Sequence, residues 1–175
     1  MKKLWTDLHS NIHHNQMDEL DKWTEHAKEV LDFWPIQMIK TESGAGLEDL
    51  CLEEEIKKDW EIVRGKVKEE NANGYPMFMG YEWQGCGFDG DHNVFFLDNE
   101  QDMKHPMRYQ ELRDDYKDTE AIGIPHHVAY QLGSRGKNWA THDENFSPFA
   151  EIYSSHGCSE NDTGGMDMER HLHMG

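Results

Sequence analysis

The apolar positions of the chain follow a helical period in three segments. From Met17 to Leu31 they recur every three or four residues, with charged residues between them. This spacing is typical of an amphipathic helix. A similar pattern covers about residues 47–70, and a shorter one predicts a helix around residues 107–116.

Short, mainly apolar runs separate these segments and predict strands. They cover residues 4–8, 33–36, 77–83, 94–97, 121–124 and 149–153. Pro35 places the second run in a short strand or at a sheet edge, because proline cannot donate a backbone hydrogen bond. Strands that alternate with helices are typical of parallel α/β architecture, in which functional residues collect at the carboxyl ends of the strands.

Composition limits the class of protein. A chain of 175 residues favours a single domain over residues 1–175. The 35 acidic and 17 basic side chains give a formal charge of −18, which argues against general nucleic-acid binding. We interpret acidic stretches such as residues 53–55 as solvated helix surface. No apolar run is long enough to span a membrane, and cysteines without C-x-x-C spacing favour a reducing, cytoplasmic setting.

Histidines lie next to the predicted strands. One group follows the first run, a single histidine precedes the run at 94–97, a pair follows the run at 121–124, and another histidine follows the last run: His9, His13, His14, His92, His126, His127 and His156. Glu82 lies near the end of the run at 77–83. Neutral imidazoles and carboxylates bind Zn, Mn and Fe well, so the pattern predicts a multinuclear metal site.

Two histidine pairs leave alternatives open. His13 and His14 are neighbours on an extended backbone, so we expect at most one of them to face the same metal as His9. Alternation along a strand likewise separates His126 from His127 if the strand continues through the pair. We favour His127 as the inward residue.

Other polar residues suggest supporting roles. Asp7 is either a metal ligand or the carboxylate that fixes the tautomer of an imidazole. Arg135 and Lys137 lie in a glycine-rich loop, for which a solvated loop and an anion contact are both open. The motifs G-x-S-x-G and Walker A do not occur in the sequence, which argues against serine hydrolases and P-loop ATPases.

Five ordered motifs resemble those of the PHP (polymerase and histidinol phosphatase) superfamily, especially its bacterial PHP-like branch. They span residues 4–160 and read Asp7-Leu8-His9, Gly80-Tyr81-Glu82-Trp83, Gly90-Asp91-His92-Asn93-Val94, Ile124-Pro125-His126-His127 and Glu151-Ile152-Tyr153-Ser154-Ser155-His156-Gly157. The resemblance implies a distorted (β/α)7-type barrel that binds two or three Mn, Zn or Fe ions and hydrolyses phosphoesters. It implies as metal ligands His9, Glu82, His92, one of His126 and His127, and His156.

The sequence departs from the family pattern in two places. The first family motif reads H-x-H, whereas Asn11 stands at its second position, so that His13 or His14 substitutes or one metal is lost. A closing Asp-x-His pair has no counterpart before Gly175. We therefore expect an incomplete barrel. The chain is then a fragment, a subunit completed by a partner, or a member without catalysis, and a homo-oligomer stays open.

The combined expectation is a metal-dependent hydrolase of a small-molecule phosphoester. Metal-activated water would attack the phosphoryl centre while the cations stabilise the added charge. Asp7 and His127 are the residues expected in catalysis, and Arg135 and Lys137 those expected at the substrate. Two alternatives stay open: a non-catalytic metal-binding module or incomplete subunit, and an amidohydrolase-type enzyme that opens amides or lactones.

Overall fold

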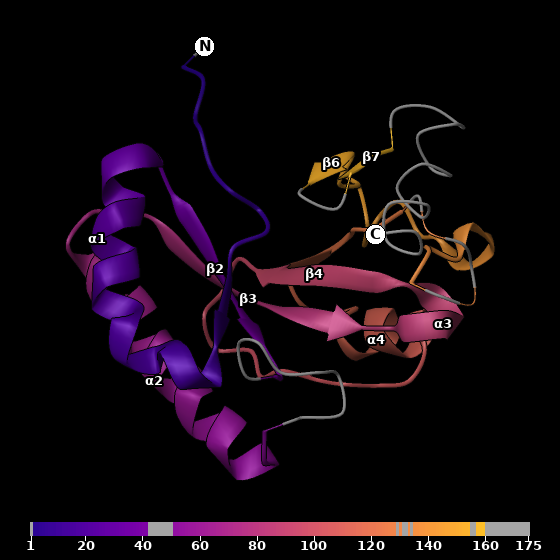
Figure 1. Cartoon of the computed structure of the whole chain (residues 1–175), viewed down its shortest axis with the longest axis horizontal. Coiled ribbons are helices and arrows are strands. Elements are labelled where there is room, and N and C mark those ends of the chain that lie inside the picture. The colour runs from indigo at the N-terminus through magenta and orange to yellow at the C-terminus, as the bar shows by residue number, and fades with distance from the viewer. Residues whose placement is uncertain are drawn as a thin grey trace. The chain divides into compact units, whose positions relative to one another are not determined.

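A computed structural model describes residues 2–41, 51–128, 130, 133, 135–154 and 157–159. These residues form an α/β structure (Figure 1). Its main sheet has five strands in the order β1-β2-β3-β4-β5. The elements are β1 (Asn11–His13), the 3-10 helix η1 (His14–Glu19), α1 (Leu20–Val30), β2 (Trp34–Ile39), α2 (Glu53–Ala72), β3 (Met77–Gln84), α3 (Cys86–Asp89), β4 (Asp91–Phe96), α4 (Tyr109–Asp115), β5 (Ala121–Pro125), η2 (Trp139–Thr141), β6 (Tyr153–Ser154) and β7 (Gly157–Cys158).

The chain groups into two compact units. The first unit contains residues Met1–Glu82 and Phe95–Met103, and the second contains Trp83–Val94 and Lys104–Gly175. Strands β3 and β4 contribute residues to both units. The expectation of a single domain stays a prediction.

Parallel strands give the sheet of the first unit two different faces. Strands β1, β2 and β3 pair in parallel, with Gln37 opposite both Asn11 and Gly80. One face carries fully buried apolar side chains such as Met38 and Tyr81, and Tyr81 packs edge-to-face on Trp60 of α2 at 6.2 Å. Because side chains alternate along a strand, Asn11 and Gln37 lie on the opposite face. We call this opposite face, which also carries Glu82, the polar face.

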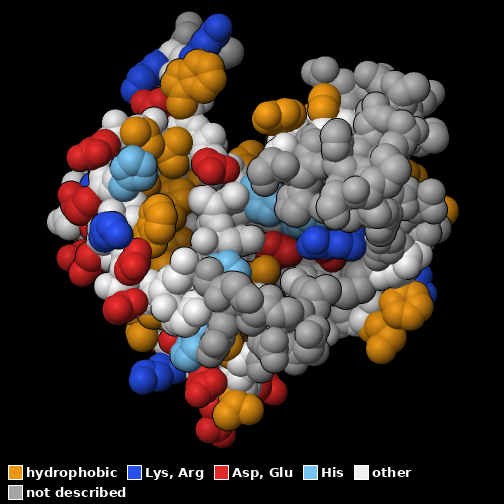
Figure 2. All heavy atoms as spheres, in the orientation of Figure 1, with side chains coloured by type: hydrophobic (Ala, Val, Ile, Leu, Met, Phe, Trp, Pro, Cys, Tyr) orange, Lys and Arg blue, Asp and Glu red, His pale blue; other side chains and the backbone are white. Residues whose placement is uncertain are grey.

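Helices α1 and α2 lie side by side in the first unit (Figure 1). Ion pairs join them, Lys28 to Glu70 and Lys66 to Asp21, each at 2.6 Å. Glu53–Glu55 are exposed, as predicted for solvated helix surface, and Figure 2 shows charges of both signs over this unit. In the part of the chain that the structure describes, no helix is both long and apolar enough to cross a membrane.

The run with Pro35 forms a short strand in the middle of the sheet, so the alternative of a short strand is confirmed and that of a sheet edge is wrong. Strand β2 lies between β1 and β3. The backbone N–H of Gln37 donates to the carbonyl of Ser10 at 3.4 Å, on the β1 side of the strand. Pro35 faces the same side two residues earlier, where the pairing with β1 has not begun. Its missing N–H therefore costs the sheet no hydrogen bond.

The first predicted strand, residues 4–8, does not form. Leu4 is 55% exposed and Trp5 70% exposed, and the first strand begins at Asn11. An apolar run predicts a strand only if its side chains find a surface to cover. The predicted helix from Met17 is confirmed by η1 and α1.

The order of strands makes the sheet mixed. Only residues 85–90 connect β3 to β4, and a parallel crossover needs about a dozen residues or more, so β4 runs antiparallel to β3. In the second unit the backbone N–H of His126 donates to the carbonyl of Asp91 at 3.1 Å. The end of β5 therefore lies beside the start of β4.

The last predicted strand, residues 149–153, is also wrong. Two backbone hydrogen bonds hold this segment against β5, from Gly123 N–H to the Phe146 carbonyl at 2.8 Å and from Glu151 N–H to the Pro125 carbonyl at 3.0 Å. Pro148 lies between these two contacts and has no N–H, which interrupts a regular ladder. The segment continues into a short antiparallel pair, β6 and β7.

Candidate metal centre

In the first unit, the segment leading into β1 and strand β3 bring two predicted ligands together. His9 Nε2 lies 3.8 Å from Glu82 Oε2, and the Glu82 side chain is 4% exposed. The side-chain N–H of Asn11 donates to the same oxygen at 2.7 Å. Asn11, which the sequence marked only as a lost imidazole, is therefore a direct partner of the carboxylate.

His13 and His14 have different surroundings. His13 shares the face of Asn11, two residues away on β1, and its Nδ1 lies 3.0 Å from the carbonyl of Thr41. A carbonyl accepts only, so Nδ1 carries the proton and Nε2 keeps its lone pair for a ligand. The ring of His14 pairs with Asp59 of α2. His13 is the better placed of the two to replace the missing imidazole, and its role as a ligand stays a prediction.

In the second unit, the start of β4 and the end of β5 form a buried group of metal-binding side chains. Asp91, His126 and His127 each offer one ligand atom, and these atoms all lie within 4.8 Å of one another. The three residues are 2%, 0% and 2% exposed, respectively. Two imidazoles and one carboxylate are a donor set that suits Zn, Mn and Fe. The chemistry of the group therefore fits the predicted metal.

The backbone of His127 explains why both histidines join this group. His127 has a φ of 54°, and no other described non-glycine residue has a positive φ. Such a conformation is costly for a residue with a Cβ and is often found at functional sites. Strand β5 ends at Pro125, so the expected alternation does not apply, and the two rings lie 4.5 Å apart.

A loop around residue 136 packs directly on the turn before β4. Gly90 has a φ of +76°, and a Cβ there would lie 2.8 Å from two carbonyl oxygens of this loop. Only glycine allows this approach. The contact brings two basic side chains of the loop to the start of β4. Arg135 Nε and Nη2 both lie 2.8 Å from Asp91 Oδ2. Lys137 Nζ lies 3.0 Å from His92 Nε2.

His92 and Lys137 form a buried pair beside the metal-binding group. Lys137 is 4% exposed, and burial lowers its pKa to about 8. Burial and the charge of Lys137 hold the pKa of His92 well below 6.5. His92 Nδ1 also lies 3.2 Å from the Gly90 carbonyl, so the ring donates there and accepts from Lys137. In this conformation both ring nitrogens are in use, and the role of His92 as a metal ligand stays a prediction.

No protein-family model, curated protein or solved structure matches the chain. The resemblance to the PHP superfamily therefore rests on the five sequence motifs alone and stays a prediction.

Asp89 also holds the loop around residue 136 in place, through Asn138. Its carboxylate is fully buried and accepts hydrogen bonds from Arg108 Nε at 2.8 Å, the Tyr109 backbone at 3.0 Å and Asn138 Nδ2 at 3.0 Å. Burial alone would raise the pKa of Asp89, but these hydrogen bonds outweigh it and lower the pKa from 3.8 to about 2.

We expect Asp89→Asn to lower the free energy of unfolding by about 2 kcal/mol at neutral pH, because each pKa unit corresponds to about 1.4 kcal/mol. The folded-state pKa is the lower one, so this stabilisation is present above about pH 4 and is lost as the pH falls toward about 2. Urea unfolding of both proteins across this range measures the difference. Equal unfolding free energies of the natural protein and Asp89→Asn at neutral pH would contradict a stabilising role for the Asp89 carboxylate.

The remaining predicted residues lie elsewhere or outside the described residues. Asp7 is exposed, and its Oδ1 accepts a hydrogen bond from the His9 backbone at 2.8 Å. That contact shapes the turn before β1, and a catalytic role for Asp7 stays a prediction. His156 lies outside the described residues.

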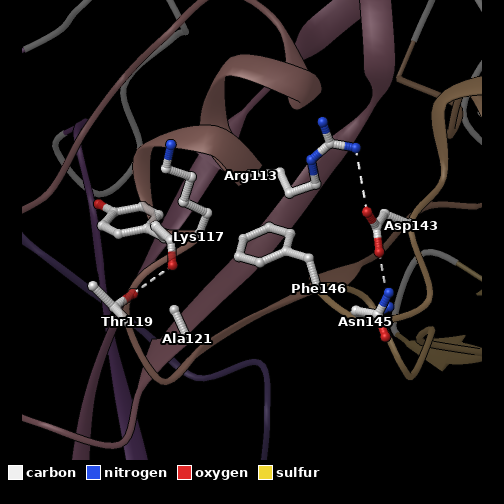
Figure 3. A pocket seen from close by; sticks show the side chains of 8 residues that line it. Arg113, Lys117, Thr119, Ala121, Asp143, Asn145 and Phe146 are labelled. Carbon is white, nitrogen blue, oxygen red and sulfur yellow. Dashed lines mark hydrogen bonds and ion pairs between the residues drawn. The ribbon is translucent and has the colours of Figure 1, made fainter.

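A cavity of about 270 Å³ lies at the opposite end of β5 from the histidine pair. Its lining residues are Arg113, Tyr116, Lys117, Thr119, Ala121, Asp143, Asn145 and Phe146 (Figure 3). Arg113 pairs with Asp143 at 3.2 Å along its wall. None of the predicted site residues lines this cavity.

The sequence did not predict a role for three residues at these positions. Asp91 begins β4 and belongs to the buried group with His126 and His127. Asn11 bonds to Glu82, and Gln37 lies opposite Asn11 on the polar face. A lone amide within the apolar run that forms β2 was the signal for Gln37.

Proposed function

We propose that this protein is a metal-dependent hydrolase of phosphate esters with a PHP-like fold, in which the described strands form part of a distorted barrel. The observation that carries the proposal is the buried group of Asp91, His126 and His127, with ligand atoms within 4.8 Å of one another. Buried imidazoles beside a carboxylate are a costly arrangement that a bound cation would stabilise. Two or three Zn, Mn or Fe ions are the expected cofactors.

The residues around this group favour an anionic substrate. A divalent ion held there supplies Lewis acidity toward a phosphoryl oxygen and toward water. Arg135 and Lys137 come from one loop and bring a guanidinium and an ammonium next to Asp91 and His92. Within the described residues Lys137 makes no ion pair, so its charge is available to a phosphate oxygen. An amide or lactone is neutral before reaction and offers no anionic group for this second cation to bind.

We expect the full chain, purified without chelator, to contain a transition metal and to hydrolyse 4-nitrophenyl phosphate or its diester. His126→Ala should lower both metal content and turnover, with about a 100-fold loss of activity or more, because a lost ligand costs at least as much as a lost ligand-orienting residue. His142→Ala is the matched control in the same unit, and should leave both unchanged. Elemental analysis and a chromogenic assay give the two readouts.

Three outcomes would contradict the proposal in different ways. If the purified protein contains no metal and hydrolyses no substrate, the proposed hydrolase function is contradicted. Bound metal without turnover would favour a metal-binding module. Hydrolysis of lactones or amides with no action on phosphates would favour the amidohydrolase alternative.

A further inference from the structure

Gln37 is a buried amide without a hydrogen-bond partner. Its side chain is 0% exposed, and neither Oε1 nor Nε2 has a partner among the described residues. Burial of an amide is unfavourable unless its polar atoms are bonded, so such a group in a protein core usually has a ligand or a functional reason.

The sheet places Gln37 beside the pair formed by Asn11 and Glu82. Gln37 lies on the middle strand, opposite Asn11 on one side and Gly80 on the other, on the polar face. Neighbouring strands are about 4.8 Å apart, so a bond from β1 to β3 must cross the width of β2. The hydrogen bond of 2.7 Å between the side chains of Asn11 and Glu82 therefore passes over β2, the strand that carries Gln37.

A cation would satisfy the oxygens of this cluster. Asn11 uses its side-chain nitrogen for Glu82, and its Oδ1 is buried and has no hydrogen-bond partner among the described residues. Gln37 offers a second amide oxygen, and His9, two residues before β1, approaches Glu82 at 3.8 Å. A carboxylate cannot donate to amide oxygens, so lone pairs converge on this part of the polar face.

We propose that His9, Asn11, Gln37 and Glu82 form a cation site with one imidazole and three oxygen ligands. This site prefers Mn²⁺, and replacement of one amide ligand by an imidazole shifts its selectivity toward Zn²⁺. Carboxylate and amide oxygens suit Mg²⁺ and Mn²⁺, whereas imidazole suits Zn²⁺. Asn11 and Gln37 thus set the identity of the ion. The inference rests on the proposed function only for the use of this ion in hydrolysis.

The test compares the affinity of the full chain for Mn²⁺ and Zn²⁺, each measured alone by equilibrium dialysis with elemental analysis. Gln37→Met should weaken Mn²⁺ binding by about 10-fold to 100-fold, the range typical for groups that support a metal site. Asn11→His should raise the preference for Zn²⁺ over Mn²⁺ by about 10-fold, because it restores a second imidazole. Gln110→Met makes the same exchange on α4 in the second unit and should leave both affinities unchanged.

A stability measurement separates a ligand from a structural role. Methionine has nearly the volume of glutamine, and Gln37→Met breaks no hydrogen bond that the described residues make. The metal-free variant should therefore unfold at the same temperature as the natural protein or higher. A lower unfolding temperature together with unchanged Mn²⁺ affinity would show that Gln37 serves packing and would overturn the proposal.

The outcomes distinguish this site from the hydrolase. If phosphoesters are hydrolysed and Gln37→Met leaves the Mn²⁺ affinity unchanged, the proposed hydrolase is supported and the proposed cation site is contradicted. An unchanged Zn²⁺ to Mn²⁺ ratio in Asn11→His also contradicts the site. If Mn²⁺ binding depends on Gln37 but no substrate is hydrolysed, the proposed cation site is supported and the proposed hydrolase is contradicted.

Discussion

Lys137→Met should raise the free energy of unfolding of the metal-free protein by about 2 kcal/mol at neutral pH. Burial lowers the pKa of Lys137 from 10.5 to about 8, so the folded state carries the cost of holding a desolvated ammonium. At about 1.4 kcal/mol for each pKa unit this cost is about 3 kcal/mol. Loss of the contacts with His92 and with the Tyr109 ring, whose centroid lies 3.5 Å from Nζ, offsets part of the gain.

The pH dependence of this difference has a defined sign. Below pH 8 the amine is charged in both the folded and the unfolded chain, so the whole cost is present. Between the folded pKa of about 8 and the ordinary value of 10.5, the folded chain loses its proton first, and the cost disappears. The natural protein should therefore gain stability relative to Lys137→Met across this interval.

Urea unfolding at neutral pH and above pH 10 gives the measurement. Lys104→Met is the matched control, because Lys104 also lies over a tyrosine ring, at 5.0 Å, but near the surface. It should change stability by no more than about 0.5 kcal/mol. A destabilised Lys137→Met at neutral pH would show that the ammonium is well compensated where it lies. The natural retention of so costly a residue fits a role in binding an anion.

Local sequence patterns predicted most of the first unit because each element carries its own signal. Helix α2 buries Ile56, Trp60, Val63 and Val67 at helical spacing, and β3 is a mainly apolar run. The runs at residues 4–8 and 149–153 have similar composition, yet they do not join the sheet as strands. In the second run Pro148 interrupts the hydrogen bonding to β5, and in the first the side chains stay exposed. Pairing is decided by long-range contacts that a local pattern does not contain.

The candidate sites were predictable to the extent that imidazoles mark them. His126 and His127 were predicted as alternatives, and the positive φ of His127 brings both into one group. That conformation could not be read from the sequence, because histidine does not require it. Asn11 and Gln37 carry no metal signal as single residues. Their significance appears only from the strand order, which places β2 between the two ends of the Asn11 to Glu82 bond.

Arg135→Gln should have the opposite effect from Lys137→Met. Both guanidinium contacts go to Asp91 Oδ2 at 2.8 Å, and Asp91 is 2% exposed. Removal of one partner from a buried ion pair costs about 3–5 kcal/mol, and since Arg135 is 31% exposed we expect about 2 kcal/mol in the metal-free protein. The variant keeps an uncharged donor at the position of the guanidinium Nε but leaves the carboxylate with less positive charge beside it.

Metal binding should reverse this loss. An ion held by Asp91, His126 and His127 restores positive charge at the carboxylate, and a ligand stabilises the folded state in proportion to the logarithm of its concentration over its dissociation constant. Added Mn²⁺ or Zn²⁺ should therefore stabilise Arg135→Gln more than the natural protein and close most of the gap. Arg113→Gln is the control, because Arg113 pairs with Asp143, which is 25% exposed, and its smaller cost should not respond to metal. If metal stabilised both proteins equally, Arg135 and the ion would act on Asp91 independently.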